Sequence, residues 1–572
     1  IWPGLPIVMS SFEIRKSADH DPVEAEQLAD IRGAHYYPAG ERMDHFGLAA
    51  DHVAYRLARF VARSDYHDNL VKEDAGLLFR KEHHRLSGHY LHLRDLARPD
   101  NGLLALKIGP PCDEQLNYPG YDFFASSLTL AICGSGISEG ELDSGEALSS
   151  YAYAVGVTSG SPEAGLELFR DLDRRRHPPR PKRGFTILSN TWGGGNHGKN
   201  LSEQMVRDEI LAAADIGLTH VQIDAGWHKG LFSDLTVEAA KPRGPYDVDP
   251  DFYAIHPDKF PRGFEPVIEA AGEQGIGLGL WFHPDSTNDY ARWEQDAEFV
   301  LSMYRQYGFN PVKIDGVKVM SKRGEANLLA FFERLHTGSE GRLCVNFDIT
   351  GGKSRRIGHF YGTEQTGNLF IENRYWTNRT YYPWRTLRNL WQLCKYFPSY
   401  RLQMEFCDVE KGREKYGDDL LRPEVFGTEY GCACTLFANP LCWMEAAQLG
   451  AEERKRLKSL VSAYRPHQAA ILQGRVFPMG EEPCGRAWTG LQSVHGEGEG
   501  YLIVFRELTD RSEGRFFLCS IAPGRALSLE CVAGAHPGGE LVPGDDGEIM
   551  LALPRPASYA LLKYSQDLSG SA

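Results

Sequence analysis

Acidic side chains lie at the ends of four candidate strands in the middle of the chain. Asp224 ends HVQID, Asp315 ends PVKID, Asp348 lies near the end of RLCVNFDI, and Glu372 lies in NLFIEN. A single acid in such a place often caps the helix that follows. Capping needs no aromatic neighbour, however, and several of these runs also carry a tryptophan at or just after their ends. We therefore predict one catalytic pocket rather than four separate helix caps.

Two carboxylates on either side of a glycosidic bond are the minimum equipment for its hydrolysis. One must be ionised to attack the anomeric carbon, and the other must be protonated to donate to the leaving oxygen. Lys313 precedes Asp315 by two residues, so both side chains point to the same face of a strand. A nearby ammonium favours the ionised carboxylate, which makes Asp315 the candidate nucleophile. A structural salt bridge is the alternative role for Lys313.

Other residues at the ends of these runs could contact a ligand. Trp192 and Trp281 could stack on the face of a sugar, although packing within the fold is the simpler role for each taken alone. Glu405 and Asp408 are reserve candidates for the second carboxylate. The further polar and aromatic candidates at these positions are Asn190, Trp227, His283, Asp285, Arg355, Arg356 and Arg379.

The elements that carry these residues alternate between strand-like and helical stretches from residue 185 onwards, at the spacing of βα units. One expected helix begins with Asn200 as N-cap and Glu203 three residues later, and ends at Gly217; another ends at Gly308. Eight such strands predict a closed (β/α)₈ TIM barrel with its active site at the carboxyl ends of the strands. The eight runs are FTILSN, HVQID, IGLGLWFH, PVKID, RLCVNFDI, NLFIEN, RLQMEF and CTLFAN.

Strand-like runs separated by turn signals occupy both ends of the chain. Residues 1–182 predict a β-sandwich-type domain that ends at the linker HPPRPKRG. Residues 183–490 are expected to form the barrel, and 491–572 a small C-terminal β-sandwich. The predicted fold class is therefore α/β, with a barrel between two β domains.

The composition narrows the class of ligand. A net charge of −15 disfavours nucleic acid, whose phosphates need a basic patch. No apolar run is long enough to cross a membrane. The eleven cysteines are scattered, without a C-x-x-C pair, and the first residues do not look like a secretory signal, so we expect a cytoplasmic protein. The sequence leaves the oligomeric state open, a homo-oligomer included.

The barrel motifs resemble those of glycoside hydrolase family 36, which contains the melibiase-type α-galactosidases and the raffinose synthases. The matching stretches follow one another in the same order and spacing over about 183–490. They are SNTWGG, THVQIDAGW, HPDKFPRGFEPVIEAAGEQGIGLGLWFHP, VKID, ENRYWTNR and FPMGEEPCGRAWTGLQ. The end domains resemble the family's N-terminal supersandwich and C-terminal sandwich only by position.

The resemblance implies a retaining, exo-acting hydrolase of terminal α-galactosides that uses no metal and no cofactor. It implies that Asp315 is the nucleophile and that Glu372 occupies the position of the acid/base. The residues that would contact the substrate are Trp192, Asp224, Trp227, Trp281, His283, Lys313, Asp348, Arg355 and Arg379. The expected partner is an oligosaccharide or another glycoside.

Three departures from the family pattern concern the glycone. The family's D-D-G-W is Asp224-Ala225-Gly226-Trp227 in this chain, so one of the two aspartates that hold the sugar hydroxyls is missing. Asp348 stands about where the family has a cysteine. Glu372 replaces an aspartate and lengthens the acid/base side chain by one methylene. The mechanism survives these changes, but the identity of the sugar does not follow.

Several alternatives remain open. The glycone could be a modified one, such as an α-N-acetylgalactosaminide or a β-L-arabinopyranoside, or the chain could transfer a glycosyl group to another sugar as raffinose synthases do. A carbohydrate-binding protein without activity is a third class. GGGNHGKN nearly matches a nucleotide-binding loop but lacks the Ser or Thr that holds magnesium. His83, His84, His89 and His92 could bind a metal, but an exposed hairpin is the simpler expectation.

Overall fold

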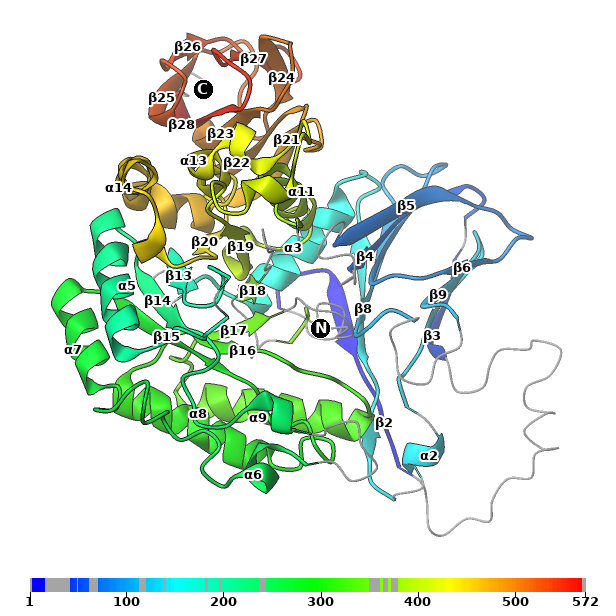
Figure 1. Cartoon of the computed structure of the whole chain (residues 1–572). Helices are drawn as coiled ribbons and strands as arrows, with labels where there is room; N and C mark the ends of the chain where they lie inside the picture. The colour runs from blue at the N-terminus through cyan, green and yellow to red at the C-terminus, as the bar shows by residue number, and fades with distance from the viewer. Residues whose placement is uncertain are drawn as a thin grey trace.

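Three groups of elements follow one another along the chain: N-terminal β-sheets, an eight-stranded barrel and C-terminal β-sheets (Figure 1). This arrangement confirms the predicted fold class. The computed structural model describes residues 3–15, 42–48, 50–60, 70–112, 120–137, 139–142, 145–180, 184–195, 197–235, 243–348, 361–363, 369–371 and 379–567.

The N-terminal part is a sandwich of two antiparallel sheets. The larger sheet consists, in spatial order, of β1 (Ile7–Ser10), β12 (Ala152–Thr158), β8 (Gly102–Ile108), β7 (Tyr90–Asp95), β4 (Val53–Phe60) and β5 (Val71–Leu78). The smaller sheet consists of β3 (Arg42–Gly47), β10 (Thr129–Cys133), β9 (Phe123–Ala125) and β6 (His84–Leu86). Leu57 and Leu91 of the larger sheet share a core with Phe123 and Leu130 of the smaller one. A short pair, β2 (Glu13–Ile14) and β11 (Leu148–Ser149), lies beside them with helix α2 (Glu139–Leu142).

The expected exposed histidine hairpin is wrong for two of its four members. His89 and His92 are completely buried in the sandwich. His89 accepts a hydrogen bond from the backbone N–H of Phe60 at 2.9 Å, and His92 pairs with Thr158 at the same distance. Their ring nitrogens serve the fold, and no group of metal-binding side chains is found among the described residues.

The barrel is closed by parallel pairing of eight strands, because β13 pairs with both β14 and β20. All eight carboxyl ends therefore lie on one rim. The strands are short, and those whose burial is described are mostly buried, as expected for runs covered on both faces. They are β13 (Leu188–Asn190), β14 (His220–Ile223), β15 (Gly277–Phe282), β16 (Val312–Ile314), β17 (Val345–Asp348), β18 (Leu369–Ile371), β19 (Leu402–Phe406) and β20 (Asn439–Cys442).

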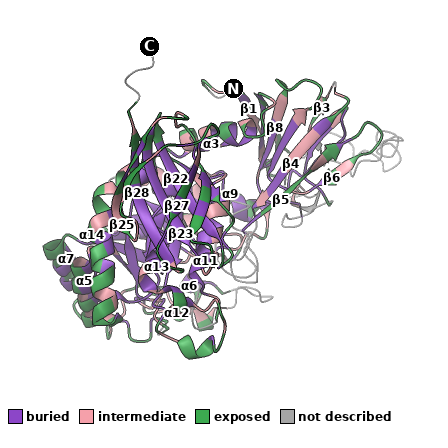
Figure 2. Cartoon of the chain, turned by 90° about the horizontal axis from the view of Figure 1, so that it is seen from above, coloured by how far each residue is buried: buried purple, intermediate pink, exposed green. Residues whose placement is uncertain are grey.

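Helices follow most of these strands. The main ones are α5 (Glu203–Ile216), α7 (Glu265–Gln274), α8 (Trp293–Tyr307), α9 (Lys322–Gly338), α11 (Pro383–Leu393) and α14 (Ala451–Gln473). Short helices lie in the connections between these elements: α6 (Pro245–Val248), α12 (Pro423–Phe426), α13 (Thr428–Ala433), and the 3₁₀ turns η1 (Phe232–Asp234), η4 (Ser399–Arg401), η5 (Arg413–Lys415) and η6 (Ala446–Gln448). Figure 2 shows the exposed outer faces of α5 and α7. No helix among the described residues is both long and apolar enough to cross a membrane.

Two local predictions in the barrel are wrong. The first helix is capped by Ser202, whose hydroxyl accepts a hydrogen bond from the N–H of Met205 at 3.2 Å, and not by Asn200. The run CTLFAN was expected to be the last strand, but most of it forms buried turns after α13. The last strand begins only at Asn439, the final residue of that run. The predicted helix ends at Gly217 and Gly308 are confirmed, and both glycines adopt the left-handed conformation with φ of 94° and 74°.

The C-terminal part contains a six-stranded and a two-stranded antiparallel sheet. The larger sheet begins with β21 (Arg475–Gly480), which precedes the boundary expected at 490. It continues in spatial order with β22 (Trp488–Gly496), β23 (Glu499–Arg506), β28 (Ser558–Gln566), β25 (Leu527–Gly534) and β26 (Gly539–Leu541). β24 (Glu513–Phe517) and β27 (Glu548–Ala552) form the smaller sheet. Helix α3 (Ala164–Arg176) connects the N-terminal sandwich to the barrel.

Candidate active site

Three charged side chains meet beneath the rim of the barrel. Lys313 of β16 places its ammonium 3.3 Å from Oδ2 of Asp224 and 3.3 Å from Oδ2 of Asp348. All three side chains are only 3% exposed. They come from the ends of β14, β16 and β17, which confirms that these strand ends converge. Two carboxylates share one ammonium, so these three groups together keep one unit of negative charge at the floor of the rim.

Neutral residues also form hydrogen bonds with the charged side chains of this floor. Asn190 and Gln222 donate side-chain hydrogen bonds to Oδ2 of Asp224 at 2.8 and 3.2 Å. The hydroxyl of Thr191 accepts from the backbone N–H of Asp224 at 3.0 Å. The ring of Trp443, just after β20, lies 4.9 Å from the ammonium of Lys313. The charged group is thus bonded from several sides, which a buried ion pair requires if it is not to destabilise the fold.

Asp315 lies at the edge of this floor and is only partly buried. Its Oδ2 accepts a hydrogen bond from the indole N–H of Trp281 at 3.1 Å, and its Oδ1 accepts from the backbone N–H of Gly316 at 2.5 Å. Donors of this kind stabilise the ionised carboxylate. A partly exposed carboxylate that is fixed by two N–H donors is the arrangement that a nucleophile needs.

Gly316 allows the ring of His283 to approach the backbone next to Asp315. Its φ is +68°, and a Cβ on it would lie 1.7 Å from Nδ1 of His283. No other residue fits here without displacing that ring. The backbone next to Asp315 is therefore in direct contact with His283, which follows β15.

Trp281 is itself held in an aromatic cluster. His228 stacks on its indole with ring centroids 5.8 Å apart and planes 14° apart, and Phe232 meets it edge-on at 5.2 Å. Burial lowers the pKa of His228 to about 4, and the nearby Lys259 and histidines add to this effect. His228 is therefore neutral at pH 7. One face of Trp281 is covered, so its clearest role is to hold Asp315.

Trp192 and Ala225 line another part of the rim. The backbone N–H of Trp192 donates to Oδ1 of Asn190 at 2.8 Å, and its partly exposed ring stacks on His197 at 5.1 Å. Ala225 donates its N–H to Oδ1 of Asp224 at 2.8 Å and presents only a methyl group beside it. The structure thus places a methyl group beside Asp224, where the family pattern would have a carboxylate.

Two predicted candidates lie behind the rim instead. Trp227 is completely buried, and its indole N–H donates to the backbone oxygen of Trp281 at 2.9 Å. Asp285 is 1% exposed and accepts two hydrogen bonds from Thr287, while its own N–H donates to Asp296 at 2.7 Å. Both support the strand ends from outside the barrel, so we do not retain them as substrate contacts.

The remaining candidates separate into three groups. Arg379 is half-exposed and forms an ion pair with Asp419 at 3.2 Å. The reserve acids are buried: Glu405 accepts from Thr386 at 2.8 Å, and Asp408 accepts from the N–H of Glu410 at 3.0 Å. The other three candidates, Arg355, Arg356 and Glu372, lie outside the described residues.

Sequence reasoning missed two residues that follow β20. Trp443 faces Lys313, as described above, and Glu445 is a buried carboxylate whose oxygens have no hydrogen-bond partner among the described residues. A Cβ on Gly194, in the loop after β13, would lie 1.4 Å from Oε2 of Glu445. Burial raises the pKa of Glu445 to about 7, and the nearby Glu209 adds to this. Both were missed because the last strand was expected earlier in the chain.

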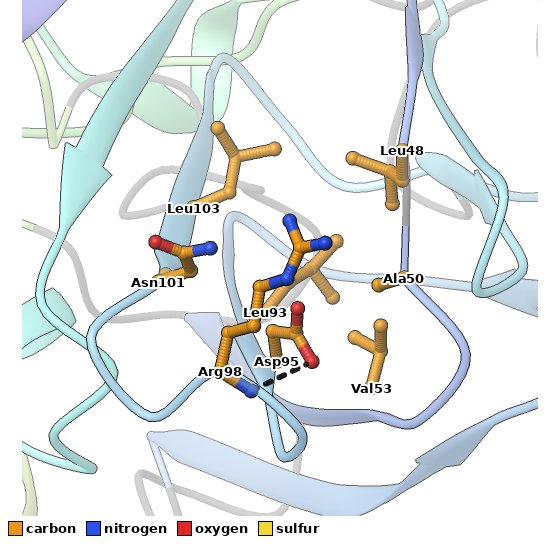
Figure 3. A pocket seen from close by; sticks show the side chains of 9 residues that line it. Leu48, Ala50, Val53, Leu93, Asp95, Arg98, Asn101 and Leu103 are labelled. Carbon is orange, nitrogen blue, oxygen red and sulfur yellow. Dashed lines mark hydrogen bonds between the residues drawn. The ribbon is translucent and has the colours of Figure 1, made fainter.

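The described residues also line an open pocket of about 210 Å³ in the N-terminal sandwich (Figure 3). It lies at one end of the N-terminal sandwich and has an apolar wall that includes Leu48, Val53 and Leu93, with Asp95 and Arg98 at its edge. None of its residues comes from the barrel, so we assign the site to the barrel rim.

The structure is similar to several solved structures. An α-galactosidase AgaA variant from Geobacillus stearothermophilus in complex with raffinose aligns with a TM-score of 0.65 at 11% identity, over 91% of this chain and 76% of that one. The galactosidase domain of an α-galactosidase–sucrose kinase, AgaSK, and an α-galactosidase from Lactobacillus brevis both align with a TM-score of 0.66 over 92% of this chain and 75% of theirs, at 13% and 12% identity.

The chain has the fold of the family 36 α-galactosidases. The likeness includes the flanking sheets as well as the barrel, since it covers more than nine tenths of the chain. No protein-family model and no curated protein sequence matches the chain. At this identity the likeness establishes the α-galactosidase fold, and the residues of the rim must carry any inference about activity.

Proposed function

We propose that this chain is a retaining, exo-acting glycoside hydrolase that removes terminal α-galactoside-type residues by double displacement. Asp315 carries the proposal. It is a half-buried carboxylate at the carboxyl end of β16, held by two N–H donors at the edge of a buried charged floor. The names of the structural relatives support the same activity, and one AgaA complex contains raffinose and another stachyose.

In the proposed mechanism Asp315 attacks the anomeric carbon and forms a covalent glycosyl intermediate, which water then hydrolyses. Glu372 protonates the leaving oxygen in the first step and deprotonates water in the second. The floor residues Asp224, Lys313 and Asp348 bind glycone hydroxyls, and their excess negative charge favours the oxocarbenium-like transition state. Trp192, His283, Arg355 and Arg379 are the further proposed contacts.

The glycone is the least determined part of the proposal. Ala225 offers no acceptor, so a substrate modified at the edge that it faces is a second candidate, with α-N-acetylgalactosaminides and β-L-arabinopyranosides as examples. Transfer to a sugar acceptor instead of water would use the same covalent intermediate. Product analysis with and without an added acceptor separates hydrolysis from transfer, and turnover of any aryl glycoside excludes a protein that only binds carbohydrate.

The decisive experiment replaces the nucleophile. Asp315→Gly should lose nearly all turnover of nitrophenyl α-galactoside, about 10⁴-fold or more, because no covalent intermediate can form. Azide should restore part of it by attacking the activated substrate in the vacated space. The first product of the intact enzyme, followed by NMR, should retain the anomeric configuration. A first product of inverted configuration, or a variant with ordinary activity, would overturn the proposal.

The acid/base is tested by leaving groups. Glu372→Gln should reduce turnover of an alkyl or sugar galactoside by about 10²–10⁴-fold, the usual contribution of general acid catalysis. For a nitrophenyl galactoside, kcat/KM should fall far less, because this parameter reports the first step, in which nitrophenolate leaves with little need of a proton. Equal losses on both substrates would move the role to Glu405 or Asp408.

A further inference from the structure

Two large aliphatic side chains are exposed on the loops beside Asp315. Leu231, in the loop after β14, is 62% exposed, and Met320, in the loop after β16, is 72% exposed. The partly exposed ring of Phe232 follows Leu231 directly. We call Leu231, Phe232 and Met320 the rim shelf. Apolar surface left in water at the mouth of a site is a candidate for contact with a ligand.

Ring contacts join Phe232 of the shelf to the residues that surround the proposed nucleophile. The ring of Phe232 lies 5.0 Å from that of His283 and 5.2 Å from that of Trp281. His283 abuts the backbone of Gly316, and Trp281 donates to Asp315. Met320 follows Gly316 by four residues, just before α9 begins at Lys322. The loop after β14 thus reaches Asp315 through Phe232 and Trp281, and Met320 lies on the loop that follows Asp315 itself. The two strands that carry these loops, β14 and β16, lie on either side of β15.

The direction of the leaving group follows from burial. The floor that would bind the glycone is 3% exposed, whereas Asp315 is partly exposed and the shelf residues more so. A glycone seated on the floor must point its anomeric oxygen outwards, past Asp315 and towards the loops. The aglycone attached to that oxygen then contacts the rim shelf.

We infer that the rim shelf binds an apolar aglycone of alkyl or aryl type. The inference rests on the proposed hydrolase function and specifies its substrate class. Leu231 and Met320 present no hydrogen-bonding N–H or O–H from their side chains, so they cannot replace the hydration of a second sugar. Binding is favoured instead when an alkyl chain or an aromatic ring covers them, because their apolar surface is then removed from water.

The test compares n-hexyl with methyl α-D-galactopyranoside. The wild type should show a kcat/KM for the hexyl glycoside at least about 10-fold higher. Leu231→Ser and Met320→Ser should each lower the hexyl-to-methyl ratio about three- to tenfold, the factor expected when an aliphatic contact of this size is lost. Leu211→Ser is the matched control, since Leu211 is 55% exposed on α5, on the outside of the barrel, and the ratio should not change.

A ratio near one in the wild type, or one that both shelf variants leave unchanged, overturns the inference. Absence of hydrolysis of both glycosides is a failure of the proposed function and is recognised as such. In that case, calorimetry of glycoside binding tests the rim shelf independently of hydrolysis. Binding of the hexyl but not the methyl glycoside, weakened by Leu231→Ser and not by Leu211→Ser, supports it, and the absence of such binding overturns it.

Discussion

Ala225 presents a methyl group beside Asp224, at the position where the family 36 pattern has a second aspartate. In the proposed function, that aspartate would accept hydrogen bonds from the sugar. A hydrogen bond to a charged group contributes about 1.5–3 kcal/mol, or about 10–150-fold in binding. The vacant edge should tolerate a glycone without its 6-hydroxyl group. Asp285 does not supply the missing carboxylate, because it is buried behind the strand ends and bonded to Thr287.

We therefore predict that Ala225→Asp lowers the ratio of kcat/KM for β-L-arabinopyranoside to that for α-galactoside by about 10-fold or more. The two nitrophenyl glycosides share ring stereochemistry and differ at C6, so their ratio isolates that edge of the sugar. An Ala225→Asn variant separates charge from size. If the ratio stays constant in both variants, another side chain such as His283 contacts this edge.

At the scale of single residues, the sequence predicts a site residue correctly where its position along a strand determines which way its side chain points. Lys313 lies near the end of one barrel strand, and Asp224 and Asp348 end two others, so the rim brings these three side chains together. Trp227 lies only three residues after Asp224 but turns into the core. That difference depends on which face of a loop packs against α8 and its neighbours, and local sequence does not contain it.

At the level of elements, the loop after β14 supports Trp281, which lies near the end of β15 and donates a hydrogen bond to Asp315. His228 stacks on Trp281 and on Phe252, with ring centroids 5.8 and 5.3 Å apart. His228→Leu should lower kcat/KM for nitrophenyl galactoside about 2- to 12-fold, the factor equivalent to one aromatic pair. His228→Phe keeps the stack and should stay close to the wild type.

The pH profile distinguishes this support from a titrating role. Because the pKa of His228 is about 4, the acid limb measured above pH 5 should be the same in wild type and His228→Phe. A limb that moves in the phenylalanine variant would show that the imidazole titrates in the working range. Thermal unfolding of both variants controls for a general loss of stability.

Periodicity and turn signals were enough to locate seven of the barrel strands, because each is a short apolar run between polar loops. The eighth was misplaced because CTLFAN, which precedes it, is equally apolar and is also buried. Its turns are set by packing behind the strand, not by turn residues. The error concealed Trp443 and Glu445, so one wrong boundary removed two candidate residues from the rim.

At the level of the whole molecule, buried carboxyl groups link stability to pH. Burial raises the pKa values of Asp296, Glu445 and Glu507 to about 7. Each group binds its proton more tightly folded than unfolded, so its contribution is fully present below about pH 4 and is lost as pH rises to 7. Three buried histidines with pKa values lowered to about 4, namely His92, His220 and His228, act in the opposite direction.

A difference between variant and wild type isolates one carboxyl from these opposing effects. Glu445→Gln should gain stability over the wild type between pH 5 and pH 8, by up to about 3 kcal/mol at pH 8, because a raised pKa of this size corresponds to that free energy. Urea unfolding at the two pH values measures it. Glu452→Gln, at an exposed glutamate early in α14, is the control. An equal effect at both pH values would contradict the assignment.

Phe60, at the end of β4, packs against four aromatic rings that belong to other parts of the chain. Its neighbours are Phe169 of α3 and, from the barrel part, Tyr361, Tyr396 and Phe397. Side chains of α3 also reach the start of the C-terminal sheet, where Arg170 donates to the backbone oxygen of Val476 at 3.3 Å. The barrel is therefore not a separable catalytic module: a gene trimmed to encode it alone would yield a polypeptide with an open aromatic face and a strong tendency to aggregate.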